Sequence, residues 1–98
     1  MIRSFANRGT EDVFNGVPSR EARRVCPVQL WPVARRKFTQ INRVRSLAEL
    51  GVPPGNRLEA LRGDRAGQYS IRINERYRVC FSWEEGYADD VEIADYHS

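Results

Sequence analysis

The stretch that decides the fold is Gln68-Tyr69-Ser70-Ile71-Arg72-Ile73-Asn74-Glu75-Arg76-Tyr77-Arg78-Val79-Cys80-Phe81-Ser82-Trp83. Apolar and polar residues alternate on both sides of Asn74-Glu75-Arg76, as in two strands that each bury one face. The predicted apolar face holds Tyr69, Ile71, Ile73, Tyr77, Val79, Phe81 and Trp83. The opposite face holds Gln68, Ser70, Arg72, Asn74, Arg78, Cys80 and Ser82. The short polar connection suits a tight turn, so the stretch predicts an antiparallel hairpin.

Further strands are expected on either side of this hairpin. Gly86 lies in the next turn, and residues 90–96 make a last strand with Val91 and Ile93 as its buried positions. Leu58 and Leu61 flank a short strand before the glycine-bounded turn 63–67. Residues 2–6 alternate weakly and predict a first strand.

Helical signals occupy the first half of the chain. Thr10 with two acids after it predicts an N-cap, and Gly16 a stop, which gives a short helix near 10–15. Pro27 and Pro32 interrupt the main helical region, residues 20–45, and Pro32 suits the first turn of a helix that runs to about Arg45. The apolar stripe of that helix is Ala34, Phe38, Ile41 and Val44.

The order of the elements sets the fold class. Ser46 and Glu49 match a capping box that starts a short helix ending at Gly51, and the segment 53–56 marks the change from helix to strand. One strand, then helices, then three or four consecutive strands predict an α+β fold. The N-terminal helices should pack on one face of a small antiparallel sheet.

Length and composition fit one cytoplasmic domain over residues 1–98. The chain has 98 residues, of which 41% are hydrophobic, and it shows neither an apolar run long enough to span a bilayer nor a secretory signal. Cys26 and Cys80 are far apart in the sequence and form no metal-binding spacing. We expect both to be reduced and half-buried, with a disulfide or a metal site as the weaker alternative.

Charge is distributed unevenly along the chain. Residues 1–83 hold all 16 basic residues and 7 acids, whereas residues 84–98 hold 6 acids and no lysine or arginine. Fifteen of the 16 basic residues are arginine, which binds phosphate bidentately and stacks on bases. The basic body therefore suits a polyanionic partner such as a nucleic acid. A codon bias toward arginine explains the same composition equally well.

Three segments of the second half form one pattern: Pro53 to Asn74, Tyr77-Arg78-Val79-Cys80-Phe81-Ser82-Trp83, and Val91-Glu92-Ile93-Ala94-Asp95-Tyr96-His97. With these segments the second half resembles the HigB family of toxins, in the RelE/ParE superfamily of toxin–antitoxin systems. The segments 2–5 and 34–37 also fit, so the resemblance covers nearly the whole chain, and residues 16–32 match least well.

The resemblance implies a RelE-like fold and cleavage of mRNA inside the ribosome, without a metal or another cofactor. His97 then serves as the acid or base, since an imidazole titrates near neutrality. Arg78 clamps the phosphate, and Tyr96 and Asp95 stack, hydrogen-bond or orient neighbours. The alternatives are an inert terminal histidine, a core tyrosine, a surface ion pair of Asp95, and an ion pair of Arg78 with the acidic tail.

Two positions depart from the family pattern. Arg62 stands where family members often carry lysine, and arginine cannot donate a proton at neutral pH. Glu59 stands where some relatives have histidine. The cations expected to bind RNA without sequence preference are Arg35, Arg36, Lys37, Arg43, Arg57 and Arg65, with an ordinary solvated surface as the alternative. Four aromatic residues are expected in the core: Trp31, Tyr69, Phe81 and Trp83.

The resemblance also implies partners. It predicts a HigA-type helix-turn-helix antitoxin, with the ribosome and A-site mRNA as targets, operator DNA reached only through the antitoxin, and no membrane. Two other functions stay open. One is a non-nuclease toxin that binds a protein, as the ParE toxins bind gyrase, and the other is a regulator that binds RNA without cutting it.

Overall fold

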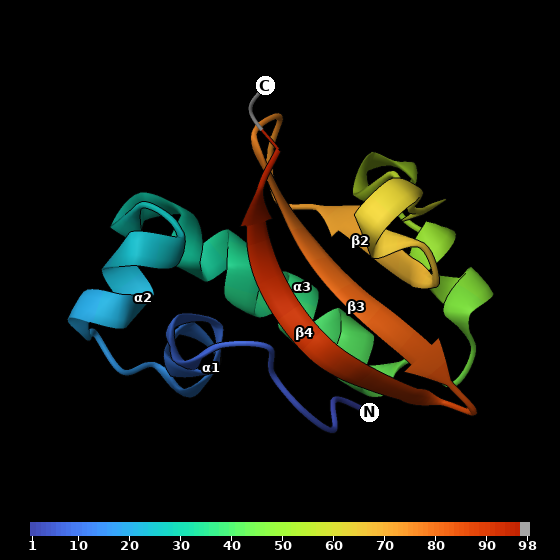
Figure 1. The fold of residues 1–98 in the computed structure, drawn as a ribbon, viewed down its shortest axis with the longest axis horizontal. Coiled ribbons are helices and arrows are strands. Elements are labelled where there is room, and N and C mark those ends of the chain that lie inside the picture. Colours follow the sequence, from blue (N-terminus) through green and yellow to red (C-terminus); the bar gives the residue numbers. More distant parts are fainter. Residues whose placement is uncertain (97–98) are drawn as a thin grey trace.

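Four antiparallel strands form one sheet in the order β1-β2-β3-β4 (Figure 1). The computed structural model describes residues 1–96. The strands are β1 (Glu59–Ala60), β2 (Gln68–Arg72), β3 (Tyr77–Glu84) and β4 (Tyr87–Asp95). The predicted hairpin is confirmed, because β2 pairs with β3 and the Asn74 side chain accepts hydrogen bonds from the backbone N–H groups of Arg76 and Tyr77. The fold class is therefore α+β, as predicted.

The last strand starts earlier than the sequence indicates. β4 begins at Tyr87, and the register between β3 and β4 shifts between Cys80 and Ser82. Asp90 adopts a left-handed backbone with φ of 52° within β4. This irregularity interrupts the alternation at the two consecutive aspartates, which is why the pattern before Val91 did not predict a strand.

The prediction of a continuous first strand over residues 2–6 is wrong. Ile2 forms an isolated parallel bridge with Ala88, and Phe5 forms another with Val91. Between these bridges, the Ser4 side chain accepts a hydrogen bond from the backbone N–H of Asp90. The N-terminal segment thus follows β4 only where the irregular backbone of β4 permits pairing.

Three α-helices precede the sheet: α1 (Arg8–Asn15), α2 (Arg20–Val25) and α3 (Trp31–Arg43). The N-cap of α1 is Asn7 and not Thr10, because the Asn7 side chain accepts from the Thr10 backbone N–H. Thr10 is fully buried, and its hydroxyl accepts a hydrogen bond from the Ile93 backbone N–H in β4. Gly16, with φ of 74°, ends α1 as predicted.

Short 3-10 helices complete the chain: η1 (Val28–Leu30), η2 (Leu47–Gly51), η3 (Pro54–Asn56) and η4 (Gly63–Arg65). The predicted capping box of Ser46 and Glu49 is present at the start of η2. Pro32 lies in the first turn of α3, which ends at Arg43. Among the described residues, no helix has the length and apolar character needed to cross a membrane.

The helices cover one face of the sheet, as Figure 1 shows for α3 behind β3 and β4. Ala34, Phe38 and Ile41 of α3 are fully buried in the core. The Phe38 ring packs with its edge toward the rings of Phe5 and Phe14, at 6.4 and 5.9 Å between centroids. Both cysteines are free, as predicted, but Cys26 and Cys80 are fully buried and not half-buried. The opposite face of the sheet carries the predicted polar side chains.

Candidate active site

The face of the sheet opposite the helices is called here the polar sheet face. Strand alternation and register bring seven side chains to it. Ser70 of β2 pairs with Cys80 of β3, Arg72 pairs with Arg78, and Glu92 of β4 pairs with Cys80. Glu59 of β1 pairs with Ser70, and Tyr96 follows β4. The face therefore gathers residues from all four strands, separated by up to 37 positions in the sequence.

Arg78 is held tightly on this face. Its Nη1 lies 3.1 Å from Glu59 Oε1, and its Nη2 donates to the Arg57 carbonyl at 2.7 Å. Its side chain is only 12% exposed, whereas that of Glu59 is 53% exposed. An ion pair with the acidic tail was the expected alternative for Arg78, but its partner in the structure is Glu59. These contacts use Nη1 and Nη2, and the buried Nε has no hydrogen-bond partner among the described residues.

Tyr96 lies beside Arg78, whose guanidinium carbon is 5.8 Å from the centre of the phenol ring. The Cys80 thiol donates a weak hydrogen bond to the Tyr96 hydroxyl, with 3.7 Å between Sγ and Oη. Burial, followed by this contact with Cys80, raises the pKa of Tyr96 to about 12. The hydroxyl therefore stays protonated near neutral pH and can donate a hydrogen bond to an anion.

Asp95 is not part of this cluster. It pairs with Tyr77, so it lies on the other side of the strand from Tyr96. Arg76 binds its carboxylate through two nitrogens, with 3.0 Å between Nε and Oδ1 and 2.8 Å between Nη2 and Oδ2. This is the surface ion pair that the sequence analysis gave as the alternative for Asp95. His97 lies outside the described residues, so its position relative to Asp95 and Tyr96 is not described.

Two further cations come from the turn before β2. Arg65 reaches across the polar sheet face to Glu92, at 3.1 Å between Nη1 and Oε1, and to the Gln68 side chain at 3.0 Å. Arg62 is exposed and immediately precedes η4. Arg57, also exposed, contributes its carbonyl to Arg78 and leaves its own side chain at the surface.

Arg72 is a residue of this face to which the sequence analysis assigned no role. It lies directly opposite Arg78, and its buried Nε has no hydrogen-bond partner in the described part of the chain. Three buried side-chain atoms without a partner occur among residues 1–96, namely Ser70 Oγ, Arg72 Nε and Arg78 Nε. All three belong to the polar sheet face. The predicted hairpin already put Arg72 and Arg78 on the same polar face, and that shared face was the available signal.

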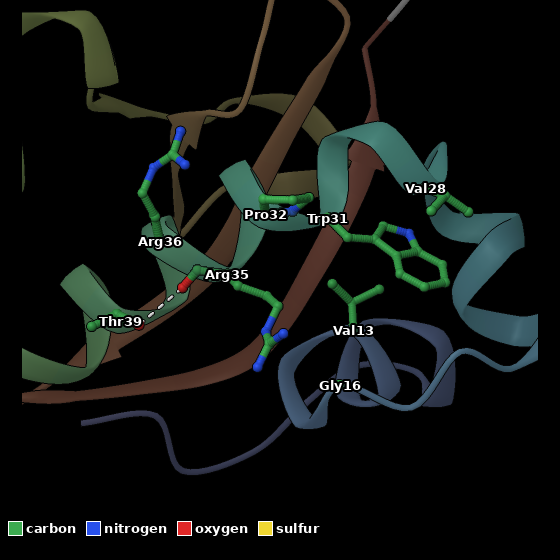
Figure 2. A pocket seen from close by; sticks show the side chains of 8 residues that line it. All are labelled: Val13, Gly16, Val28, Trp31, Pro32, Arg35, Arg36 and Thr39. Carbon is green, nitrogen blue, oxygen red and sulfur yellow. Dashed lines mark hydrogen bonds between the residues drawn. The ribbon is translucent and has the colours of Figure 1, made fainter.

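The predicted RNA-binding residues of α3 lie on the helix side of the molecule. A cavity of about 580 Å³ lies beside α3. Figure 2 shows its lining, with Trp31 over Val13 and the Arg35 side chain extending toward α1. Arg36 also lines it, and a second cavity of about 340 Å³ extends past Arg36 to Arg43. These cations are exposed on α3, which packs on the face of the sheet opposite the polar sheet face.

Lys37 differs from its neighbours on α3. Its ammonium group donates to Asn56 Oδ1 at 2.6 Å, and Asn56 is fully buried. The Asn56 amide also donates to the Gln40 side chain and to the Leu50 carbonyl. Lys37 thus ties α3 to η3, which fits a structural role. Among residues 1–96, no group of three or more histidine, cysteine, aspartate or glutamate residues is arranged to hold a metal ion.

Comparison with known proteins identifies the family. The sequence model described as "RelE-like toxin of type II toxin-antitoxin system HigB" matches residues 3–97. The chain belongs to the HigB-like toxin family. A relative from Vibrio cholerae, Toxin HigB-1, is 37% identical over 65 residues, which are 66% of this chain and 68% of that protein. Endoribonuclease HigB of Proteus vulgaris is 28% identical over 102 residues, covering 99% of this chain and all of that protein.

The fold of this HigB-like toxin also matches a solved structure. The YoeB-YefM complex from Staphylococcus aureus contains a chain that aligns with a TM-score of 0.60 and 13% identity, over 100% of this chain and 99% of that chain. This likeness confirms the predicted RelE-like fold. Membership of the HigB-like toxins makes the chain the toxin of a type II toxin–antitoxin system, and an antitoxin is its partner.

Proposed function

We propose that this HigB-like toxin is an mRNA endonuclease that acts on the ribosome and needs no metal. The observation that carries the proposal is Arg78, a nearly buried arginine with an unpartnered Nε beside the protonated phenol of Tyr96. A cation and a hydrogen-bond donor so placed suit an RNA phosphate, whose charge grows during cleavage. The full-length likeness to a protein named Endoribonuclease HigB supports the same reading.

The proposed reaction is attack of a ribose 2′-OH on the adjacent phosphate. The bond to the 5′ oxygen of the next nucleotide breaks, and that oxygen takes a proton. His97 is the proposed acid or base, a role contributing roughly 10²- to 10⁴-fold. Arg78 offsets the charge of the phosphorane-like state, and Tyr96 donates a hydrogen bond to it. Arg62 adds a second cation near the scissile phosphate.

Asp95 has a positioning role in this proposal. Its carboxylate is bound by Arg76 at the end of β4, and the backbone N–H of Tyr96 donates to the Arg76 carbonyl at 2.6 Å. These two contacts fix the strand end from which Tyr96 and His97 follow. The geometry supports this role over that of a proton acceptor.

RNA contacts outside the polar sheet face are proposed for the exposed arginines. Arg57 flanks Arg78, and Arg35, Arg36 and Arg43 provide a second basic surface along α3 for ribosomal RNA. The contact of Arg65 with Glu92 makes it a weaker RNA ligand. The proposed partner is a HigA-type helix-turn-helix antitoxin that carries the toxin to operator DNA. Residues 1–98 are proposed to form one domain that acts in the cytoplasm.

The alternative of a protein-binding toxin, as in the gyrase-poisoning ParE toxins, gains no support from the polar sheet face. Tyrosine and arginine are also enriched at protein–protein hot spots, so the residue types of this face do not distinguish the two functions. The full-length likeness to a protein named Endoribonuclease HigB favours the nuclease.

The test compares the intact protein with the variants His97→Ala and Arg78→Gln. Each is expressed in growing cells, and mRNA 5′ ends are mapped within translated reading frames. We expect growth arrest and in-frame cuts with the intact protein, and loss of the cuts with both variants while the folded protein persists. If the intact protein and His97→Ala arrest growth equally and no in-frame cuts appear, the nuclease proposal is wrong.

A further inference from the structure

A groove, called here the α3 groove, runs along α3 on the helix side of the molecule. Its wide end is the cavity of about 580 Å³ between α1, η1 and α3 (Figure 2), and its narrow end is the cavity of about 340 Å³ beside the second half of α3. The two cavities share Arg36 and Thr39, so they follow one side of the helix. α3 has 13 residues and is therefore about 20 Å long. That length suits a short segment of another protein, such as about three turns of a helix.

The wide end of the α3 groove has an apolar lining. Trp31 lies over Val13 (Figure 2), and its indole Nε1 donates to the Cys26 carbonyl at 3.1 Å, which fixes the ring. Val28 also lines this end and is 51% exposed, and Pro32 is exposed as well. Apolar side chains that gather in a hollow and remain exposed are typical of a contact surface. An RNA backbone offers no apolar side chain for such a hollow, so the lining favours a protein partner.

Arginines form the rim of the α3 groove. The Arg35 side chain extends toward α1 (Figure 2), and its Nη2 lies 3.5 Å from the place where Gly16 would carry a Cβ. Arg35 thus reaches the C-terminal end of α1, where the helix dipole stabilises a positive charge. Among residues 1–96, no carboxylate lies within ion-pair distance of Arg35, Arg36 or Arg43. The stretch 7–45 holds nine basic and three acidic residues, so this side of the molecule is complementary to an acidic partner.

We propose that the α3 groove is the docking site for an acidic, amphipathic segment of the antitoxin. An apolar side chain of that segment enters between Val28 and Trp31, and its carboxylates bind Arg35 and Arg36, whose planar guanidinium groups suit them. Membership of the toxin family supplies the antitoxin as a partner, and the inference adds where it binds and by what chemistry. Docking there needs no residue of the polar sheet face.

The same arginines of α3 are also the proposed contacts to ribosomal RNA. The antitoxin and the ribosome should therefore exclude each other at α3. That exclusion rests on the proposed function, whereas the docking of the antitoxin does not.

The first test measures the affinity of the purified toxin for the antitoxin encoded with it, by surface plasmon resonance and without ribosomes. Arg36 lines both cavities, so Arg36→Glu should weaken binding by roughly tenfold or more, since it replaces an ion pair with a repulsion. Arg24→Glu is the matched control. It makes the same charge reversal at an exposed position of α2 that lines neither cavity, and it should change the affinity by less than about twofold.

The second test separates the apolar contact from the charge. Val28→Ser should weaken antitoxin binding by roughly threefold or more, because it removes apolar surface that the antitoxin covers. Val52→Ser makes the same change at a side chain that is 69% exposed and lies outside both cavities, and it should leave the affinity unchanged. All four variants alter exposed residues, and thermal unfolding of each confirms that it is folded.

Two results would overturn the inference: an Arg36→Glu effect no larger than that of Arg24→Glu, or a Val28→Ser affinity equal to that of the intact protein. Weaker ribosome binding by Arg36→Glu, with antitoxin binding unchanged in both groove variants, would assign the groove to RNA instead. Because the affinity measurements use neither ribosomes nor mRNA, they do not depend on the nuclease. Loss of antitoxin binding in both groove variants, with no in-frame cuts by the intact protein in cells, would retain the docking site and reject the nuclease.

Discussion

Replacing Glu59 with glutamine should make the toxin more active and less stable. Glu59 is the carboxylate that neutralises Arg78, through 3.1 Å between Oε1 and Nη1. A glutamine at this position keeps the size of the side chain and removes its charge. Arg78 retains its hydrogen bond to the Arg57 carbonyl at 2.7 Å, so its guanidinium group stays in place. The freed cation then binds the RNA phosphate with less competition.

The magnitude follows from the exposure of the two partners. The Glu59 side chain is 53% exposed and that of Arg78 is 12% exposed, so solvent screens the pair from one side. Such a partly exposed ion pair contributes about 0.5–1 kcal/mol. If the free energy of the ion pair instead stabilises the bound phosphate, cleavage becomes roughly 2- to 5-fold faster. Loss of the same free energy from the folded state lowers the melting temperature by roughly 2–8 °C.

The assay is single-turnover cleavage of mRNA on purified ribosomes, with thermal unfolding measured on the same samples. Glu75→Gln is the matched control, because it removes one negative charge from the exposed hairpin turn between β2 and β3. Faster cleavage by Glu59→Gln than by Glu75→Gln supports the reasoning. Slower cleavage would refute it, since Glu59 would then act as a proton acceptor in the position where relatives carry histidine.

Three further predictions concern single contacts. Thr10→Val should lower the free energy of unfolding by about 1–3 kcal/mol in a denaturant titration, because the buried backbone N–H of Ile93 loses its acceptor, whereas Thr10→Ser should restore most of it. Tyr96→Phe should slow cleavage about 10²-fold without changing the shape of the rate profile between about pH 6 and 9, since the pKa of Tyr96 is raised to about 12 and the phenol does not ionise there. The hydrogen bond from Arg3 lowers the pKa of Asp89 below 3.8, so the stability from this pair is present above that pH and is lost as the pH falls further. Melting temperatures measured from neutral to acidic pH should therefore fall less steeply in Asp89→Asn, and an identical fall would contradict the assignment.

The hairpin could be predicted from the sequence because two local signals agree there. Alternation indicated which residues face the core, and the polar connection at Asn74 indicated where the two strands turn. The start of β4 could not be predicted, because Asp90 takes a left-handed backbone that breaks the alternation. The cap of α1 was misplaced because Asn7 and Thr10 are both good N-cap residues, and a tertiary hydrogen bond to Ile93 decided between them.

The site was predictable only in part, because tertiary contacts that the local sequence does not show decide its ion pairs. Arg78 and Tyr96 came from the family pattern and lie together. The ion pair of Arg78 with Glu59 depends on a strand of two residues, which gives too short a pattern to reveal its register. Lys37 looked like a free cation of α3, because nothing in the local sequence shows that Asn56 is buried and available to bind it.

The acidic end of the chain is compatible with RNA binding because arginines bind its carboxylates. Asp89, Glu92 and Asp95 of β4 are each bound by an arginine of the preceding body: Arg3, Arg65 and Arg76. On the polar sheet face, Glu92 neutralises Arg65 and Glu59 neutralises Arg78, so the repulsion expected between an acidic strand and RNA is largely cancelled. Among the described residues, Arg72 then has no carboxylate partner, and the exposed Arg57 and Arg62 add further positive charge. This part of the surface therefore stays positive and can attract RNA although the chain ends in an acidic strand.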